Sequence, residues 1–209
     1  REHRIMAAVG AAGFPVPEMI LLEEDPEPIG TSFYLMERLD GRVFHDSALP
    51  DLSIAERTVA YRDTARTLAQ LHSLDWRAAG LEGFGRPGGY FGRQIARWTK
   101  QWCLSKTRDD ENIETLCTWL AAHVPADDRT AIVHGDYRIG NIMFAADAPR
   151  IIGVLDWELS TLGHPLADLA HLGTFWDFEP NELGGIAGLD HAPLGLPAHD
   201  EFIAWYLEA

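Results

Sequence analysis

A loop rich in polar residues lies between short apolar runs and limits what this chain can fold into. The runs Ala131–Val133 and Asn141–Phe144 enclose a histidine, two glycines and an aspartate, and a third apolar run, Ile151–Leu155, follows soon after. Runs this short favour β-strands over helices. We therefore expect strands that enter the interior and hold a polar loop between them.

Longer amphipathic segments surround these strands. Between Ser53 and Leu74 apolar residues recur at the three- and four-residue spacing of a helix. Gly13 is typical of the residue that follows a helix, and Pro165 of one that opens a helix. The pattern predicts helices at residues 1–12, 53–74, 90–106 and 112–123, strands at 19–22 and 32–37, and a Gly- and Pro-rich loop at 183–197.

Composition excludes some classes of partner. The 209 residues are 46% hydrophobic, which is enough to bury a core. A net charge of −15 argues against a general nucleic-acid surface, because phosphate backbones attract clustered Lys and Arg. No apolar run approaches the roughly 18 residues of a membrane span. We expect neither nucleic acid nor membrane as a partner, and a cytoplasmic location; nothing in the sequence indicates an oligomeric state.

Three oxygen-bearing side chains fall at the expected strand ends. Asp136 and Asn141 lie five residues apart across the polar loop, and Asp156 follows the next strand. Carboxylate and amide oxygens are ligands that suit Mg²⁺. If Asn141 and Asp156 hold the metal, Asp136 is free to accept a proton from an attacking hydroxyl. The alternative is structural, with Asp136 and Asn141 as turn residues that bond their own backbone.

These residues stand in an order that resembles the aminoglycoside phosphotransferase, or choline kinase-like, family. The resemblance covers nearly the whole chain, and two of its segments, at 93–98 and 156–170, look most like the branch sometimes fused to acyl-CoA dehydrogenases. It rests on REHR at 1–4, PVP at 15–17, FYLME at 33–37, LAQLH at 68–72, RQIARW at 93–98, HGD at 134–136, Asn141, and DWELSTLGHPLADLA at 156–170.

The resemblance implies an α+β, protein-kinase-like fold with two lobes. Residues 1–40 would form part of the small lobe, with helix, strands and hinge, and residues 41–209 the larger, mostly helical lobe with the catalytic loop and metal-binding segment. The family's glycine-rich loop and phosphate-gripping lysine have no counterpart here. We expect both upstream of Arg1, which would leave the small lobe truncated at its N-terminus and these 209 residues alone only feebly active.

The resemblance also assigns roles in catalysis and in holding the loop. It makes Asp136 the catalytic base, Asn141 a Mg²⁺ ligand and Asp156 the principal Mg²⁺ ligand. His134 would hold the loop without entering the chemistry, and Asp168 would orient backbone amides of the loop without touching substrate.

Nucleotide contacts follow from the same resemblance. Glu2 matches the glutamate that pairs with the phosphate-gripping lysine, although a glutamate in a first helical turn is also a common partner of the helix dipole. Met36 would border the adenine, with the Glu37 carbonyl and the Leu39 amide as hinge hydrogen-bonding groups. The structural alternative for this segment is an ordinary edge strand.

The expected activity is ATP-dependent transfer of the γ-phosphoryl group to a hydroxyl of a small molecule. The acceptor is aminoglycoside-like or hydroxyacyl-CoA-like, and helix residues Arg93, Arg97 and Trp98 either contact it or form an ordinary packed helix face. One alternative is a catalytically inactive, kinase-like module that binds nucleotide. A less favoured one is a metal-dependent phosphohydrolase that also uses His164 and His171. The sequence does not distinguish ATP from GTP.

Overall fold

The computed structural model describes residues 1–209. In chain order its elements are α1 (Glu2–Ala11), β1 (Met19–Glu23), β2 (Phe33–Met36), β3 (Gly41–Val43), α2 (Ile54–Ser73), α3 (Tyr90–Ser105), α4 (Glu111–Ala122), β4 (Ala131–Val133), the 3₁₀ turn η1 (Ile139–Asn141), β5 (Ile142–Ala145), β6 (Ile151–Val154), β7 (Thr161–Gly163), α5 (Leu166–Gly173), the 3₁₀ turn η2 (Thr174–Trp176), α6 (His191–Leu194) and α7 (His199–Glu208).

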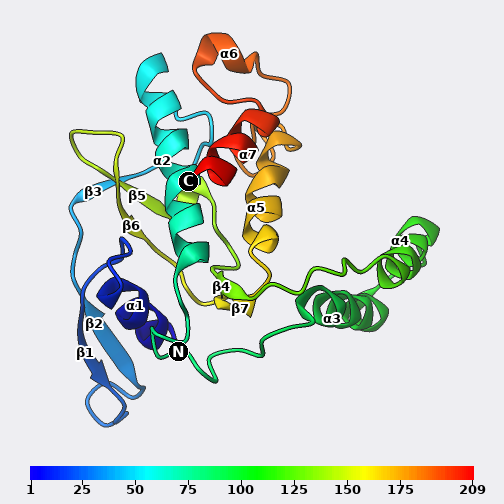
Figure 1. The fold of residues 1–209 in the computed structure, drawn as a ribbon, viewed down its shortest axis with the longest axis horizontal. Helices are drawn as coiled ribbons and strands as arrows, with labels where there is room; N and C mark the ends of the chain where they lie inside the picture. Colours follow the sequence, from blue (N-terminus) through cyan, green and yellow to red (C-terminus); the bar gives the residue numbers. More distant parts are fainter.

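The first 40 residues form a helix against an antiparallel hairpin. The hairpin of β1 and β2 extends from one side of the molecule beside α1 (Figure 1). Three residues of α1, at i, i+1 and i+4, are buried: Ile5, Met6 and Val9. These side chains join the same core cluster as residues from the rest of the chain, so this unit is packed on the remainder of the molecule.

A three-stranded antiparallel sheet follows, in the order β3–β5–β6. Its register pairs Ile142 with Val154 and Gly41 with Ala145. A side chain at Gly41 would place its Cβ 2.5 Å from the carbonyl oxygen of Phe144, so only glycine allows the strands this approach. The sheet therefore joins the segment just after the first hairpin to β5, which follows the polar loop, and to β6, which precedes Asp156.

Helix α2 is the main support of the core. Ser53 and Glu56 form a capping box that satisfies free backbone donors at its N-terminus. Its buried face includes Ala60, Ala65 and Leu68, at helical spacing. The helix packs against α7 and against β4, which pairs with β7 in a separate two-stranded ribbon. This packing fixes the strand from which the polar loop emerges.

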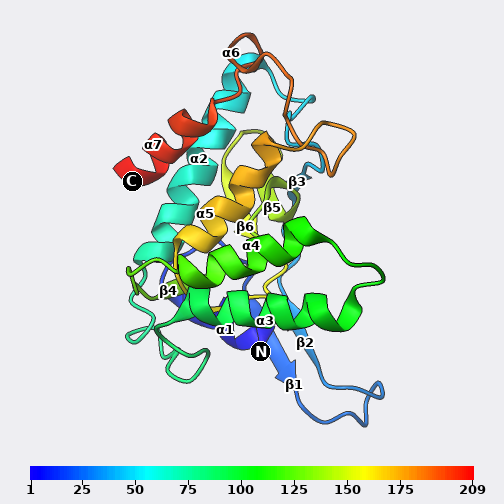
Figure 2. The same cartoon turned by 90° about the vertical axis from the view of Figure 1, so that its right-hand side faces the viewer.

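Helices α3 and α4 form a hairpin that projects from the molecule. They lie side by side (Figures 1 and 2), and in the view of Figure 1 they stand apart from α2, α5 and α7. Neither helix contains a buried residue. Large apolar side chains on the hairpin are exposed, including Trp98, Leu104 and Trp119.

The predicted α+β organisation is confirmed, with small shifts at element ends. The strand expected at 151–155 ends at Val154, and the helix expected at 90–106 ends at Ser105. The loop predicted at 183–197 is wrong in one part, because α6 forms within it. Four residues are too few to show helical periodicity. None of the helices is both long enough and apolar enough to cross a lipid bilayer.

Candidate active site

Strand pairing brings Asn141 and Asp156 to neighbouring positions. Asn141 ends η1 just before β5, and Asp156 comes two residues after β6. Beyond the Ile142–Val154 pair, the backbone N–H of Leu155 donates to the carbonyl of Asn141 at 2.8 Å. The ladder therefore continues up to the residue before Asp156, which places the backbone of Asp156 next to the end of the polar loop.

Asp136 and Asn141 are in direct contact. The Asn141 Nδ2 amide donates to the Asp136 carboxylate at 2.8 Å and to its backbone carbonyl at 2.9 Å. The structural alternative is thus partly right, since Asn141 does stabilise the loop backbone. With its nitrogen used in this way, the Asn141 amide oxygen is the atom left for a cation.

The Asp136 carboxylate is held on both oxygens. His171 Nε2 lies 2.9 Å from Oδ1, while Oδ2 accepts from Asn141 and, at 3.3 Å, from Arg138 Nε. Partial burial would raise the pKa of Asp136, but the hydrogen bonds from Asn141 and His171 and the nearby Arg138 charge outweigh it, and the pKa is lowered. Asp136 is therefore ionised at neutral pH and able to accept a proton.

Asp156 has the properties of a free ligand. Its side chain is exposed, and it accepts no hydrogen bond and forms no ion pair within the protein. Its backbone is left-handed, with φ of +65°, a region that aspartate tolerates better than most residues. With the Asn141 oxygen, it offers the hard donor set that Mg²⁺ binds, and Mg²⁺ takes its remaining ligands from water and phosphate.

His134 supports the loop, as predicted. Its Nε2–H donates to the Leu155 carbonyl at 2.9 Å, and its Nδ1 accepts from the Asp136 backbone N–H at 3.2 Å. The ring is buried, and this burial lowers the pKa of His134 despite neighbouring carboxylates. A neutral imidazole thus connects the segment before Asp156 to the residue that carries the candidate base.

Asp168, a residue of α5, binds backbone amides of the loop, also as predicted. Its carboxylate accepts from the backbone amides of His134 and Gly135, at 2.7 and 2.8 Å. The same carboxylate lies 3.2 Å from His72 Nε2, and Tyr206 Oη lies 2.8 Å from His72 Nδ1. Burial alone would raise the pKa of Asp168, but these partners, His72 first, lower it. A buried carboxylate therefore fixes the backbone at the start of the polar loop.

Gly135 is required at its position for two reasons. Its φ is +90°, a conformation that L side chains rarely adopt, and a Cβ there would lie 2.7 Å from the Leu159 carbonyl oxygen. The loop before Asp136 and the segment after Asp156 therefore approach more closely than a side chain would permit.

Residues predicted to contact nucleotide lie on the first unit and its connection to β3. Glu2 accepts a hydrogen bond from Tyr34 Oη at 2.8 Å. Burial, the bond to Glu2 and the charges of Glu2 and Asp156 raise the pKa of Tyr34 to about 12. The bond from Tyr34 to Glu2 therefore joins β2 to the first turn of α1.

The expected hinge leaves backbone groups unused. Met36 ends β2 and is exposed. The Glu37 N–H donates to Glu18, but the Glu37 carbonyl and the Leu39 N–H have no partner within the protein. Leu39 packs against Gly153 of β6, where a Cβ would collide with it. Leu39, in the expected hinge segment, thus lies beside the strand that precedes Asp156.

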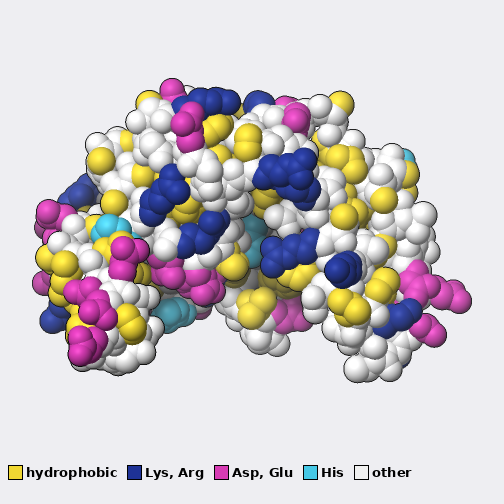
Figure 3. Space-filling model, turned by 90° about the horizontal axis from the view of Figure 1, so that it is seen from below, with side chains coloured by type: hydrophobic (Ala, Val, Ile, Leu, Met, Phe, Trp, Pro, Cys, Tyr) yellow, Lys and Arg dark blue, Asp and Glu magenta, His cyan; other side chains and the backbone are white.

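A cavity of about 680 Å³ adjoins the catalytic loop. It is lined by Gly135, Glu158–Thr161 and the start of α3, with Arg1, Arg97 and the aromatic residues Tyr90, Phe91 and Trp98. On the face seen in Figure 3, Lys and Arg side chains gather around a central hollow, and many of the Asp and Glu side chains lie to its sides. Arg97 and Trp98 therefore line the same cavity as Gly135, the residue before Asp136, whereas Arg93 bonds backbone carbonyls before α3 and does not line the cavity.

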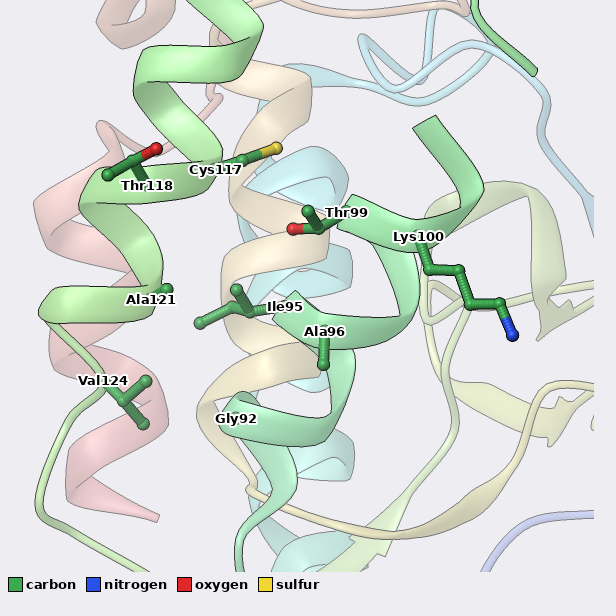
Figure 4. Close-up of a pocket in the computed structure, with 9 residues that line it drawn as sticks. All are labelled: Gly92, Ile95, Ala96, Thr99, Lys100, Cys117, Thr118, Ala121 and Val124. Carbon is green, nitrogen blue, oxygen red and sulfur yellow. The ribbon is translucent and has the colours of Figure 1, made fainter. Parts of the chain in front are cut away.

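A second hollow of about 690 Å³ lies between α3 and α4 (Figure 4). Its volume is similar, but no residue of the polar loop lines it, and Lys100 at its edge points away from α4. Of the two cavities, only the first is thus lined by a residue of the polar loop, Gly135.

Two contacts of the site were missed by sequence reasoning. His171 was considered only as a metal ligand, yet it bonds the Asp136 carboxylate; Tyr34 was part of an expected strand, yet it bonds Glu2. His171 stands three residues after Asp168, on the same side of a helix. That spacing is the one sequence signal that could have brought it into the site.

Comparison with known proteins agrees with the resemblance seen in the sequence. The profile of the phosphotransferase enzyme family matches residues 1–205. Acyl-CoA dehydrogenase family member 11 of Homo sapiens is 44% identical over 208 residues, which are 99% of this chain and 26% of that protein. The chain thus spans about a quarter of this curated relative.

Solved structures give the same result. An aminoglycoside phosphotransferase-like protein of Ralstonia eutropha superposes with a TM-score of 0.96 and 46% identity, over 99% of this chain and 64% of that one. An aminoglycoside-3'-phosphotransferase of type VIII superposes with a TM-score of 0.66 at 21% identity, over 99% and 71% of the two chains, and so shares the fold. On these matches, the chain belongs to the phosphotransferase enzyme family.

Proposed function

We propose that this chain carries the catalytic loop of an ATP-dependent phosphotransferase that phosphorylates a hydroxyl group of a small molecule. The observation that carries the proposal is the arrangement of one ionised carboxylate, Asp136, in contact with Asn141, and of Asp156 at the end of the paired strand. It separates a proton acceptor from two cation ligands, as phosphoryl transfer requires.

The proposed reaction is a direct displacement. The acceptor oxygen forms a bond to the γ-phosphorus while the bond from that phosphorus to the β–γ bridging oxygen breaks, and ADP leaves. Asp136 accepts the acceptor's hydroxyl proton. Its lowered pKa makes it a weak base, which suits a loose transition state in which little proton transfer is needed early.

Asn141 and Asp156 would hold Mg²⁺, which neutralises phosphate charge when bound. The support is chemical: the donors are an amide oxygen and an unpaired, exposed carboxylate. No group of three or more His, Cys, Asp or Glu side chains in the structure is arranged to hold a metal ion. The two-metal phosphohydrolase alternative needs such a group, with His171 as a ligand, whereas His171 bonds Asp136.

The nucleotide would lie between a smaller lobe, residues 1–40, and a larger one, residues 41–209. The division at Gly41 is supported by the pairing of β3 with β5. The unused Glu37 carbonyl and Leu39 amide would bond the adenine edge beside Met36, and Glu2 would act on the phosphate side. A purine with a donor and an acceptor on one edge matches this pair of backbone groups.

The cavity beside the catalytic loop would receive the acceptor. Two arginines, Arg1 and Arg97, and one glutamate, Glu158, line it together with three aromatic rings. This lining favours an acceptor that carries an anionic group and an apolar portion, and disfavours a polycation. A hydroxyacyl-CoA-like acceptor therefore fits better than an aminoglycoside-like one.

The test is an assay of the full-length protein with ATP, Mg²⁺ and a panel of hydroxylated acyl thioesters, hydroxy acids and aminoglycosides. We expect ADP and a phosphorylated acceptor in equal amounts, and neither with Asp136→Asn. Nucleotide binding without any product across the panel would favour the inactive-module alternative. Phosphate released to water by a protein loaded with transition metal ions would favour the phosphohydrolase.

A further inference from the structure

The Asp136 carboxylate receives a hydrogen bond from outside its own loop. His171 lies on α5, 35 residues further along the chain, and its Nε2 is 2.9 Å from Asp136 Oδ1. The acceptor is a carboxylate, so the proton of this bond is on Nε2. The other carboxylate oxygen is bound by Asn141 and Arg138 from within the loop.

Helix α5 thus contacts both the backbone of the loop and one of its side chains. Asp168 in α5 binds the backbone amides of His134 and Gly135, and His171, three residues later, binds the Asp136 side chain. Residues at this spacing share a helix face. The helix that fixes where the loop backbone lies therefore also reaches the one side chain that accepts the proton.

The position of the His171 ring is itself restrained. It stands edge-on to Phe175, with ring centres 6.4 Å apart, and the Thr174 hydroxyl donates to the His171 carbonyl at 2.6 Å. The ring is 40% exposed, so it borders the open side of the site. Arg138 and His171 are the charged or titratable groups that contact the Asp136 carboxylate.

We propose that His171 is a positioning residue that holds the Asp136 carboxylate in one orientation, leaving a lone pair directed at the acceptor hydroxyl. The proposal rests on the proposed function for its effect on turnover, although its geometric part does not. His171 donates a hydrogen bond throughout and exchanges no proton with substrate. Misplacement of a reacting group by about 1 Å can lower a rate roughly 100-fold.

The test compares His171→Leu, which cannot donate, with His171→Gln, whose amide nitrogen can reach a similar point. Both are made in the full-length protein, with the exposed His45→Leu as a matched control. We expect His171→Leu to lower kcat by about 10- to 100-fold while the KM for ATP stays within about twofold. His171→Gln should recover most of the loss, and His45→Leu should match the wild type.

A crystallographic comparison separates this inference from the proposed function. In His171→Leu the Asp136 side chain should occupy more than one rotamer, and in His171→Gln it should keep the wild-type one. An unmoved Asp136 in His171→Leu overturns the inference, whatever the activity. Unchanged kcat in His171→Leu, alongside an inactive Asp136→Asn, overturns it too; full activity in Asp136→Asn would instead contradict the proposed base.

Discussion

His72 Nε2 lies 3.2 Å from the Asp168 carboxylate, and both side chains are almost fully buried, at 4% and 1% exposure. This pair underlies the loop that carries Asp136, because the same carboxylate holds the amides of His134 and Gly135. A buried carboxylate that accepts from three donors stabilises the fold only while all three hydrogen bonds are made.

Asp168→Asn should therefore destabilise the protein strongly. The amide keeps one acceptor oxygen and introduces donors that face other donors, so we expect a loss of about 2–4 kcal/mol in the free energy of unfolding. Urea denaturation would measure it. The exposed Asp147→Asn makes the same chemical change and should stay within about 0.5 kcal/mol of wild type. Equal stabilities for the two variants would contradict the role of Asp168.

Stability should fall on acidification in two steps. The pKa of His134 in the folded protein lies below 6.5, so the unfolded protein binds more protons just below that pH, and stability present above pH 6.5 declines as pH falls. Asp168, also with a lowered pKa, contributes stability above pH 3.8 that is lost as pH falls further. Urea midpoints measured from about pH 7.5 down to about pH 2.5 would cover both steps.

The first step has its own check. His134→Gln removes the titrating ring, so the decline just below pH 6.5 should become shallower even if the variant is less stable at neutral pH. An unaltered slope in that variant would show that another group causes the decline.

Asp136→Asn should separate turnover from binding. A positioned general base contributes roughly 10²–10⁴ in rate, and Asp136 has no role in holding ATP in the ground state. We expect kcat to fall by that factor, with ATP affinity by calorimetry within about threefold of wild type. Nearly normal turnover would remove Asp136 from the reaction.

Asp156→Ala, unlike Asp136→Asn, should weaken nucleotide binding itself. Without the exposed carboxylate, affinity for the Mg²⁺–ATP complex should fall by more than about 10-fold, since even residues that only support metal ligands contribute this much. Affinity for ATP in EDTA should not change. Calorimetry on both variants, with Asp147→Ala as control, tests the assignment; an unchanged Mg²⁺ dependence would place the metal elsewhere.

Arg97→Gln should act on the acceptor alone. A charge-assisted hydrogen bond contributes about 1.5–3 kcal/mol, so the KM for an anionic acceptor should rise about 10-fold or more while the KM for ATP is unchanged. Arg108→Gln, the same substitution beyond the end of α3, is the control. A lower KM for aminoglycosides in Arg97→Gln, with no change for acyl thioesters, would instead identify a cationic acceptor.

Sequence reasoning worked where the governing contacts are local. Asp136 and Asn141 are five residues apart in one loop and are in direct contact. Asp156 lies two residues after β6, whose pairing with β5 brings the preceding residue, Leu155, to the backbone of Asn141. The bonds from Asp168 to the loop amides were predicted from the family resemblance and are confirmed. The catalytic, metal and nucleotide roles remain predictions.

Contacts between distant segments were not predictable in the same way. Helical periodicity indicates which face of α5 is buried, but not that His171 reaches Asp136 across 35 residues. The same limit applies to α3 and α4. Their sequences predict two helices, but not that both project from the molecule with no buried residue. That arrangement depends on how the distant segments of the chain pack.

At Asp156, the carboxylate that the proposed function needs stands on a left-handed backbone that lowers the stability of the folded protein. At a φ of +65° a glycine would relieve about 1 kcal/mol of strain, and it would remove the carboxylate as well. Selection of random variants for thermal resistance alone should therefore enrich Asp156→Gly, and the survivors would be folded proteins without metal-dependent turnover. If selection for the proposed activity ceased, replacement of Asp156 by glycine would be favoured, because it would raise the stability of the fold while it removed the activity.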